Sequence, residues 1–156
     1  MADKPSPEDL ARWHRCFASE CNNRAWQLAD QTTRTEAEND EMLNAGHAAA
    51  LHWSRVGDEL NDARARLLLA HVHAGCGNGQ MALRYARASH AYFMGNASPD
   101  WEVAFSHAVM AHAGAAAGDR DLHATHYHAA RTAGDAIKDS EDKATFEASF
   151  ASIPTP

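Results

Sequence analysis

Histidine is the residue type in this chain that could do chemistry most directly. Five of the eleven histidines fall within residues 106–130, where alanine, glycine and helix-forming residues separate them. Neutral imidazole is a common ligand of zinc, copper, iron and nickel. The segment therefore indicates either a site for a divalent transition metal or a helical hairpin whose histidines have a structural role.

Two metal ligands on one helix share a face only when they are three or four positions apart. His107 and His112 are five apart and point in different directions, whereas His123 and His126 have the required spacing. Asp119 lies about one turn before His123, so that one carboxylate and two imidazoles could form a ligand set. An aspartate directly after a glycine is also the expected cap of a new helix, and this alternative stays open.

A second set of candidate ligands follows from the heights of residues in neighbouring helices. In antiparallel helices joined by a turn, residues equally far from the turn lie level, and each residue adds about 1.5 Å. His112 and His126 lie level around a turn near Gly118, and the same rule places His71 and Glu41 close to this height. We therefore predict a buried metal site with His71, His112, His126 and Glu41 as ligands. Hydrogen-bonded core histidines and a solvated rim of histidines are the alternatives.

Helix-start signals and turn glycines divide the chain into seven predicted helices. Ser6, before a proline and two acidic residues, is a helix cap, and Thr35 with Glu38 three residues later is a capping box. Further starts are predicted at Asp58, Ser98, Asp119 and Asp139. The helices form a long first hairpin over residues 7–56, a second over 58–95, a third over 98–137 and a capping helix over 139–153.

Apolar residues recur with helical spacing in each predicted element. No segment alternates polar and apolar residues with the period of a strand, so the predicted fold class is all-α, with antiparallel helical hairpins stacked as an array. A chain of 156 residues with 45% hydrophobic residues has the size and composition of a single domain. We interpret the four tryptophans, Trp13, Trp26, Trp53 and Trp101, as packing anchors, because three of them fall on apolar stripes.

Charge and targeting signals exclude several classes of protein. The net charge is −7 and no two basic residues are adjacent, so the basic surface that binds nucleic acid is missing. Residues 1–10 contain no apolar stretch of a signal peptide, and no segment approaches the roughly 20 apolar residues of a membrane span. We expect a cytoplasmic protein. The cysteines, Cys16, Cys21 and Cys76, are an odd number without a CxxC motif, which favours free thiols over disulfides or a thiolate zinc site.

The second and third predicted hairpins are similar to one another. An offset of 39 residues aligns HAGCGNGQMAL with HAGAAAGDRDL, so that His73 coincides with His112 and Gly79 with Gly118. A period of this length is typical of helical repeat proteins, in which each hairpin stacks on the next.

Residues 58–137 resemble the tetratricopeptide-like families, whose hairpins place small residues where two helices touch and an aromatic residue about one turn later. The matching positions are Ala111, Gly118, Tyr127 and Ala130, with a weaker match at Ala70, Gly77 and Ala82. The tryptophan and proline positions of the family pattern are not filled. The resemblance implies an interaction module whose groove is lined by the first helix of each hairpin, here the first, third and fifth helices.

Two functions are therefore predicted. In the first, the groove binds a protein partner or a small-molecule ligand. In the alternative, the protein is a metal-dependent enzyme or a metal-binding protein, and the buried histidines and Glu41 hold a divalent transition metal. No ExxH, HExxH or GxSxG motif and no phosphate-binding glycine loop is present, so no particular reaction is indicated.

Overall fold

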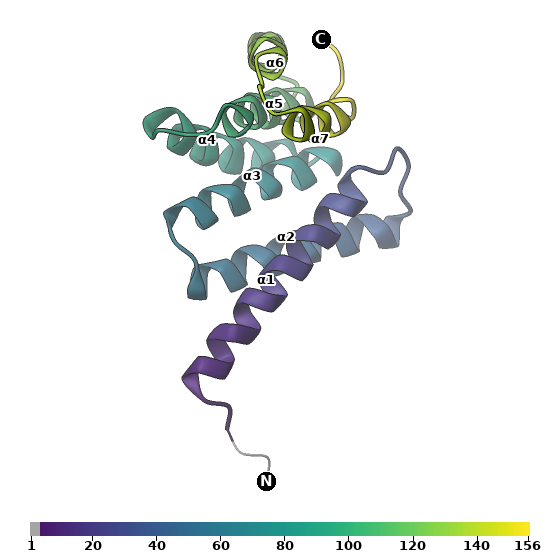
Figure 1. The fold of residues 1–156 in the computed structure, drawn as a ribbon. Helices are drawn as coiled ribbons and strands as arrows, with labels where there is room; N and C mark the ends of the chain where they lie inside the picture. The colour runs from purple at the N-terminus through teal and green to yellow at the C-terminus, as the bar shows by residue number, and fades with distance from the viewer. Residues whose placement is uncertain (1–3) are drawn as a thin grey trace.

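The computed structural model describes residues 4–156, which form seven α-helices and no strand. The helices are α1 (Pro7–Ala29), α2 (Glu36–Val56), α3 (Glu59–Gly75), α4 (Gly79–Gly95), α5 (Asp100–Ala117), α6 (Arg120–Asp135) and α7 (Ser140–Phe150). Consecutive helices pack as antiparallel hairpins that follow one another in chain order (Figure 1). The predicted all-α class is confirmed. None of the helices in the described part is both long and apolar enough to cross a bilayer.

Local sequence signals start most of the helices. At five helix starts the predicted side chain accepts a hydrogen bond from a backbone N–H of the first turn: Ser6, Thr35, Asp58, Asp119 and Asp139. Thr35 and Glu38 form the predicted capping box, in which the Glu38 carboxylate accepts from the Thr35 N–H at 2.8 Å. The prediction that Ser98 caps the fifth helix is wrong. Pro99 occupies that position, and the Ser98 hydroxyl donates to the Phe93 carbonyl instead.

The first hairpin, α1 and α2, is longer than the other two. The N-terminal half of α1 extends away from the rest of the stack (Figure 1). On this half, Trp13 and Phe17 are 45% and 51% exposed. The interpretation of Trp13 as a packing anchor is therefore wrong, because its ring lies on the exposed side of this end of α1, although the neighbouring His14 contacts His52 of α2.

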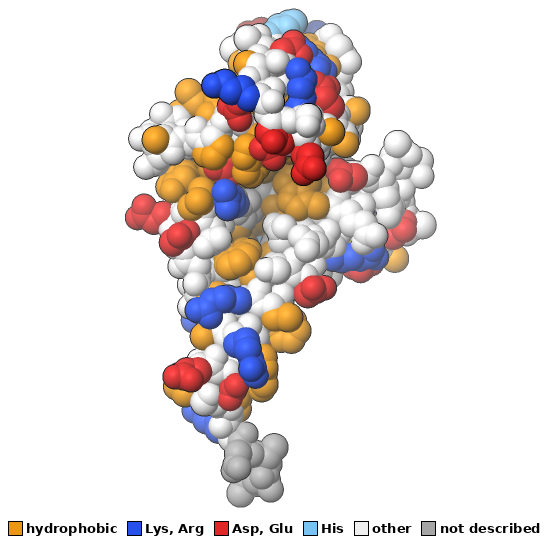
Figure 2. Space-filling view, in the orientation of Figure 1, with side chains coloured by type: hydrophobic (Ala, Val, Ile, Leu, Met, Phe, Trp, Pro, Cys, Tyr) orange, Lys and Arg blue, Asp and Glu red, His pale blue; other side chains and the backbone are white. Residues whose placement is uncertain are grey.

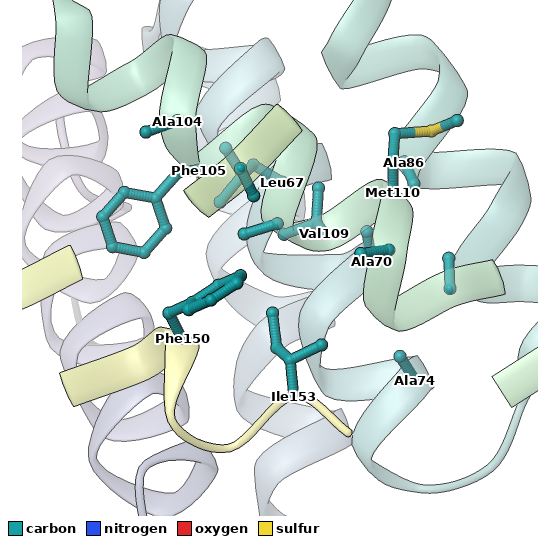
Figure 3. Packing of buried hydrophobic residues seen from close by; sticks show 14 of the residues in the cluster. Leu67, Ala70, Ala74, Ala86, Ala104, Phe105, Val109, Met110, Phe150 and Ile153 are labelled. Carbon is teal, nitrogen blue, oxygen red and sulfur yellow. The ribbon is translucent and has the colours of Figure 1, made fainter. Parts of the chain in front are cut away.

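The helix α5 lies at the centre of the stack and contacts α3, α4, α6 and α7. Its alanines and glycine allow close approach of neighbouring helices, and a Cβ atom on Gly114 would lie only 2.8 Å from the His123 backbone nitrogen. Larger side chains fill the remaining space. Figure 3 shows Phe105, Phe150 and Ile153 against small residues of α3 and α5. Dispersion contacts and apolar burial in this layer stabilise the stack.

The last helix covers one end of the core, as predicted. Phe146 and Phe150 are buried, and Phe146 packs so closely on Gly134 of α6 that a Cβ atom there would lie 2.1 Å from its ring. The Ser149 hydroxyl of α7 donates to Asp30 at the end of α1, at 3.2 Å. The contact brings α7 beside the C-terminal end of α1.

Two glycines form the tight turns of the second and third hairpins. Gly77 and Gly118 have φ angles of 74° and 75°, in the left-handed region that favours glycine. The sequence offset of 39 instead pairs Gly79 with Gly118. The structural repeat is therefore two residues longer than the sequence alignment indicates.

Candidate functional site

A groove lies where α1, α3, α5 and α7 come together. It contains a cavity of about 400 Å³, which is within the usual size range of small-ligand sites. Figure 2 shows a hollow in this face of the molecule, bordered by apolar and acidic side chains. The lining combines three aromatic rings with three carboxylates: Trp26, Trp101, Phe105, Asp30, Glu102 and Asp142. The first, third and fifth helices, which the tetratricopeptide-like resemblance implies line a groove, all contribute to this cavity.

Ring–ring contacts hold the aromatic wall of the groove. The buried Phe105 ring meets Trp26 and Trp101 edge-on, with centroid distances of 5.9 and 6.1 Å. Trp26 in turn stacks on His71 at 5.1 Å. Edge-to-face and stacked geometries are the favourable ones for aromatic pairs. Trp26 and Trp101 therefore have fixed orientations where they line the groove, in addition to their packing role.

Glu102 differs from the other carboxylates of the groove, because its side chain is only 1% exposed. Its Oε1 accepts a hydrogen bond of 2.5 Å from the Arg64 Nε. No donor among the described residues reaches its Oε2. The Arg64 guanidinium is partly exposed and lies 5.6 Å from the centroid of the Trp101 ring. A buried acceptor without a donor is unfavourable, so Oε2 marks a position where a donor group would be stabilising.

The other two carboxylates lie nearer the rim of the groove. Partial burial raises the pKa of the Asp30 carboxyl, and the hydrogen bond from Ser149 opposes this rise. The pKa of Asp142 is also raised, first by partial burial and then by the neighbouring acidic side chains. Arg64 is the one basic side chain in the lining of the cavity. The groove is therefore suited to a positively charged group.

The structure brings two of the four predicted metal ligands together. His71 and His112 are both buried, and their Nδ1 atoms lie 3.3 Å apart. Burial lowers the pKa of His71 to about 3 and that of His112 to about 4, so both imidazoles are neutral at physiological pH. At this distance one neutral imidazole donates to the other. This arrangement satisfies two buried polar side chains without a metal.

Glu41 and His126 lie elsewhere. Glu41 is exposed on α2 and accepts two hydrogen bonds from Arg24, of 2.6 and 2.9 Å. The Arg24 guanidinium lowers the pKa of Glu41 and occupies both of its oxygens. His126 contacts His107, with their Nδ1 atoms 3.0 Å apart. The four predicted ligands thus do not form one ligand group among the residues that the structure describes.

A different set of three imidazoles does meet. His90 of α4, His107 of α5 and His126 of α6 each place one ring nitrogen within 4.8 Å of the other two. The comparison of heights in neighbouring helices could have identified this group from the sequence. When residues are counted from the turn between α4 and α5, the α4 residue that lies level with His107 is about one helical turn from His90. When they are counted from Gly118, the α6 residue that lies level with His107 is about one helical turn from His126.

The set of Asp119, His123 and His126 does not form. Asp119 caps α6 by accepting from the Leu122 N–H at 3.0 Å. The imidazole of His123 donates its Nε2–H to the Pro154 carbonyl, at 2.8 Å. The alternative interpretation of Asp119 as a helix cap is therefore the one that the structure supports.

Further histidine pairs join the first three helices. His14 and His52 approach to 2.7 Å between their Nδ1 atoms, and His47 and His73 to 3.0 Å between their Nε2 atoms. In each of these pairs a single hydrogen bond between the two rings accounts for the contact. The groove with the unpartnered Oε2 of Glu102 and the group of three imidazoles are two arrangements in the described part of the chain that could bind a ligand. No family model, curated protein or solved structure matches this chain.

Proposed function

We propose that this protein binds a ligand or protein partner through a positively charged group, an ammonium or a guanidinium, that enters the groove between α1, α3, α5 and α7. The unpartnered Oε2 of buried Glu102 is the observation that carries the proposal. The groove position agrees with what the tetratricopeptide-like resemblance implies, since the first helix of each hairpin lines it.

The hydrogen-bond energy favours a cationic donor. A hydrogen bond to a charged group contributes about 1.5–3 kcal/mol, and Oε2 of Glu102 has no competing donor among the described residues. A neutral acceptor placed there would instead add a second unsatisfied group. We therefore expect a ligand that donates a hydrogen bond to Glu102, and not one that only accepts a hydrogen bond from Arg64.

The aromatic wall adds to the selectivity for a cation. A cation over a tryptophan face gains about 0.5–2 kcal/mol, depending on how much water is excluded. Arg64 already lies over the Trp101 ring, so one cation–π contact is present beside the groove. Trp26 offers a second aromatic side chain in the same lining. Asp30 and Asp142 at the rim attract the incoming charge.

Two kinds of ligand carry such a positively charged group: a free organic amine, and a partner protein with a lysine or arginine side chain. Isothermal titration of the protein with butylammonium and with capped tripeptides that contain a central lysine or arginine distinguishes them. Binding of the free cation as tight as that of the peptides indicates a small-molecule site. Binding restricted to the peptides indicates a partner protein.

Glu102→Gln is the variant that tests the site, because it keeps the side-chain volume and removes the charge. We expect affinity for the cationic probe to fall about 10- to 100-fold, the equivalent of one charged hydrogen bond. Glu36→Gln on α2 removes the same charge at an exposed position outside the groove and should leave the affinity unchanged. Absence of binding by every probe, or equal binding by the two variants, would contradict the proposal.

A further inference from the structure

Three half-buried imidazoles converge where α4, α5 and α6 meet. The ring centroids of His90 and His107 are 4.7 Å apart, and His126 lies 5.1 Å from each of them. The Nδ1 atoms of His107 and His126 are 3.0 Å apart. Each residue comes from a different helix, so the packing of the third hairpin on the second fixes the relative positions of the rings.

A hydrogen bond orients the His90 ring within this group. The Ser106 hydroxyl donates to the Val103 carbonyl at 2.9 Å, so its oxygen accepts from the Nδ1–H of His90 at 3.0 Å. The proton of His90 is therefore on Nδ1, and the lone pair is on Nε2. Metal-binding histidines have this arrangement, in which a second hydrogen bond holds the ring and leaves the other nitrogen free.

The third imidazole distinguishes this group from the histidine pairs. One hydrogen bond between His107 and His126 satisfies two rings, as it does for His71 and His112. Within residues 4–156 no hydrogen-bond partner meets the Nε2 of His90. This is also the one group of at least three possible ligand side chains within the described part of the chain. A set of three imidazoles is a complete protein ligand set for a catalytic type of zinc site.

We propose that His90, His107 and His126 bind one divalent transition metal ion, and that a fourth coordination position is open to water or to a small anion. Metal–nitrogen bonds of about 2.0–2.1 Å in a tetrahedral site place ligand nitrogens roughly 3.3 Å apart. The observed nitrogens, within 4.8 Å of one another, reach this geometry by small ring rotations. This site is separate from the groove and does not depend on the function proposed for it.

The protonation state of the group suits metal binding. Burial is the main cause that lowers the pKa of all three imidazoles, and the neighbouring rings add to the effect for His90 and His107. The pKa of His90 falls to about 4. At neutral pH all three rings are therefore uncharged, and metal binding needs no net loss of a proton. The proton in the His107–His126 hydrogen bond only has to move to the other nitrogen of its ring.

Cobalt and zinc titrations of the protein without a histidine tag test the site. After treatment with a chelator, added Co²⁺ should produce the visible absorption of a four-coordinate site and saturate at one ion per chain, and Zn²⁺ should displace it. His126→Gln and His90→Gln should each weaken binding at least about 100-fold, and Ser106→Ala about tenfold through loss of ring orientation. His128→Gln, on the exposed side of α6, is the matched control and should bind as the wild type does.

Histidine ring signals in the NMR spectrum of the wild-type protein give a second measurement that requires no substitution. Zinc should shift the ring signals of His90, His107 and His126 together and leave those of His71 and His112 unchanged. No saturable binding by the wild type would overturn the proposal. Equal binding by the His126→Gln and His128→Gln variants, or zinc shifts confined to other histidines, would overturn it as well.

Discussion

Acidification should destabilise this protein through the buried pair of His71 and His112. Their Nδ1 atoms lie 3.3 Å apart and both side chains are buried, so a positive charge on either ring would be poorly solvated. Burial lowers the pKa of His71 to about 3 and that of His112 to about 4, and the positive charge of Arg34 adds to both shifts. The folded protein therefore keeps both rings neutral well below the pH at which a free imidazole binds a proton.

The magnitude follows from the two protonation equilibria. In the unfolded chain each histidine binds a proton as the pH falls below about 6.5, whereas in the folded protein it does not until about pH 3 or 4. Stability is therefore complete above pH 6.5 and falls as the pH falls, by about 1.4 kcal/mol per pH unit for each ring. At pH 5 the pair should lower the free energy of unfolding by about 4 kcal/mol, a large part of the 5–15 kcal/mol of a typical domain. With folded pKa values of about 3 and about 4, protonation of the folded protein at pH 5 changes this value very little.

Urea unfolding followed by circular dichroism at pH 7, 6 and 5 measures the effect. The double variant His71→Gln with His112→Gln removes both titrating groups and keeps side chains that can donate and accept. Its stability difference between pH 7 and pH 5 should be smaller than that of the wild type by about 4 kcal/mol. His128→Gln, at an exposed position, should retain the wild-type pH dependence. The reasoning is refuted if the double variant loses as much stability on acidification as the wild type does.

Two further substitutions test the packing and the helix starts. Gly134→Ala should lower the free energy of unfolding by about 1–3 kcal/mol, because its Cβ atom would overlap the Phe146 ring at 2.1 Å. Gly95→Ala, whose Cβ atom would meet nothing within 4 Å, is the control and should cause no loss in the same urea experiment. Thr35→Ala should cost about 1 kcal/mol, since it removes the hydroxyl that caps α2. A stability equal to the wild type would show that the capping box is not needed there.

The helices of this fold were predictable because their signals are local. A cap residue and the first turn that it satisfies are adjacent in sequence, so Thr35 and Asp58 identify their helices directly. Ser98 shows the limit of such signals. The chain after α4 turns so that its hydroxyl reaches the Phe93 carbonyl rather than the first turn of α5. The exposure of Trp13 was not predictable either, because it depends on which side of α1 the other helices cover.

The candidate sites were predictable only in part, because height along a helix does not determine direction around it. Equal height was enough to bring His71 and His112 together, since both face the contact between α3 and α5. Glu41 has a suitable height but turns outward to Arg24, and His126 turns toward α4. Glu102 gave no signal of its own, because an acidic residue in the first turn of a helix is already explained by the helix dipole.

Indole N–H signals provide the most direct test of the cation-binding groove. The protein would be titrated with a capped peptide that contains arginine, and then with the same peptide in which neutral citrulline replaces the arginine. We predict that the arginine peptide shifts the signals of Trp26 and Trp101, which line the groove, and that the citrulline peptide does not. Trp13 and Trp53 lie outside the groove lining and should stay unchanged. Equal shifts with both peptides, or shifts of Trp13 and Trp53 alone, would contradict recognition of a positive charge by Glu102.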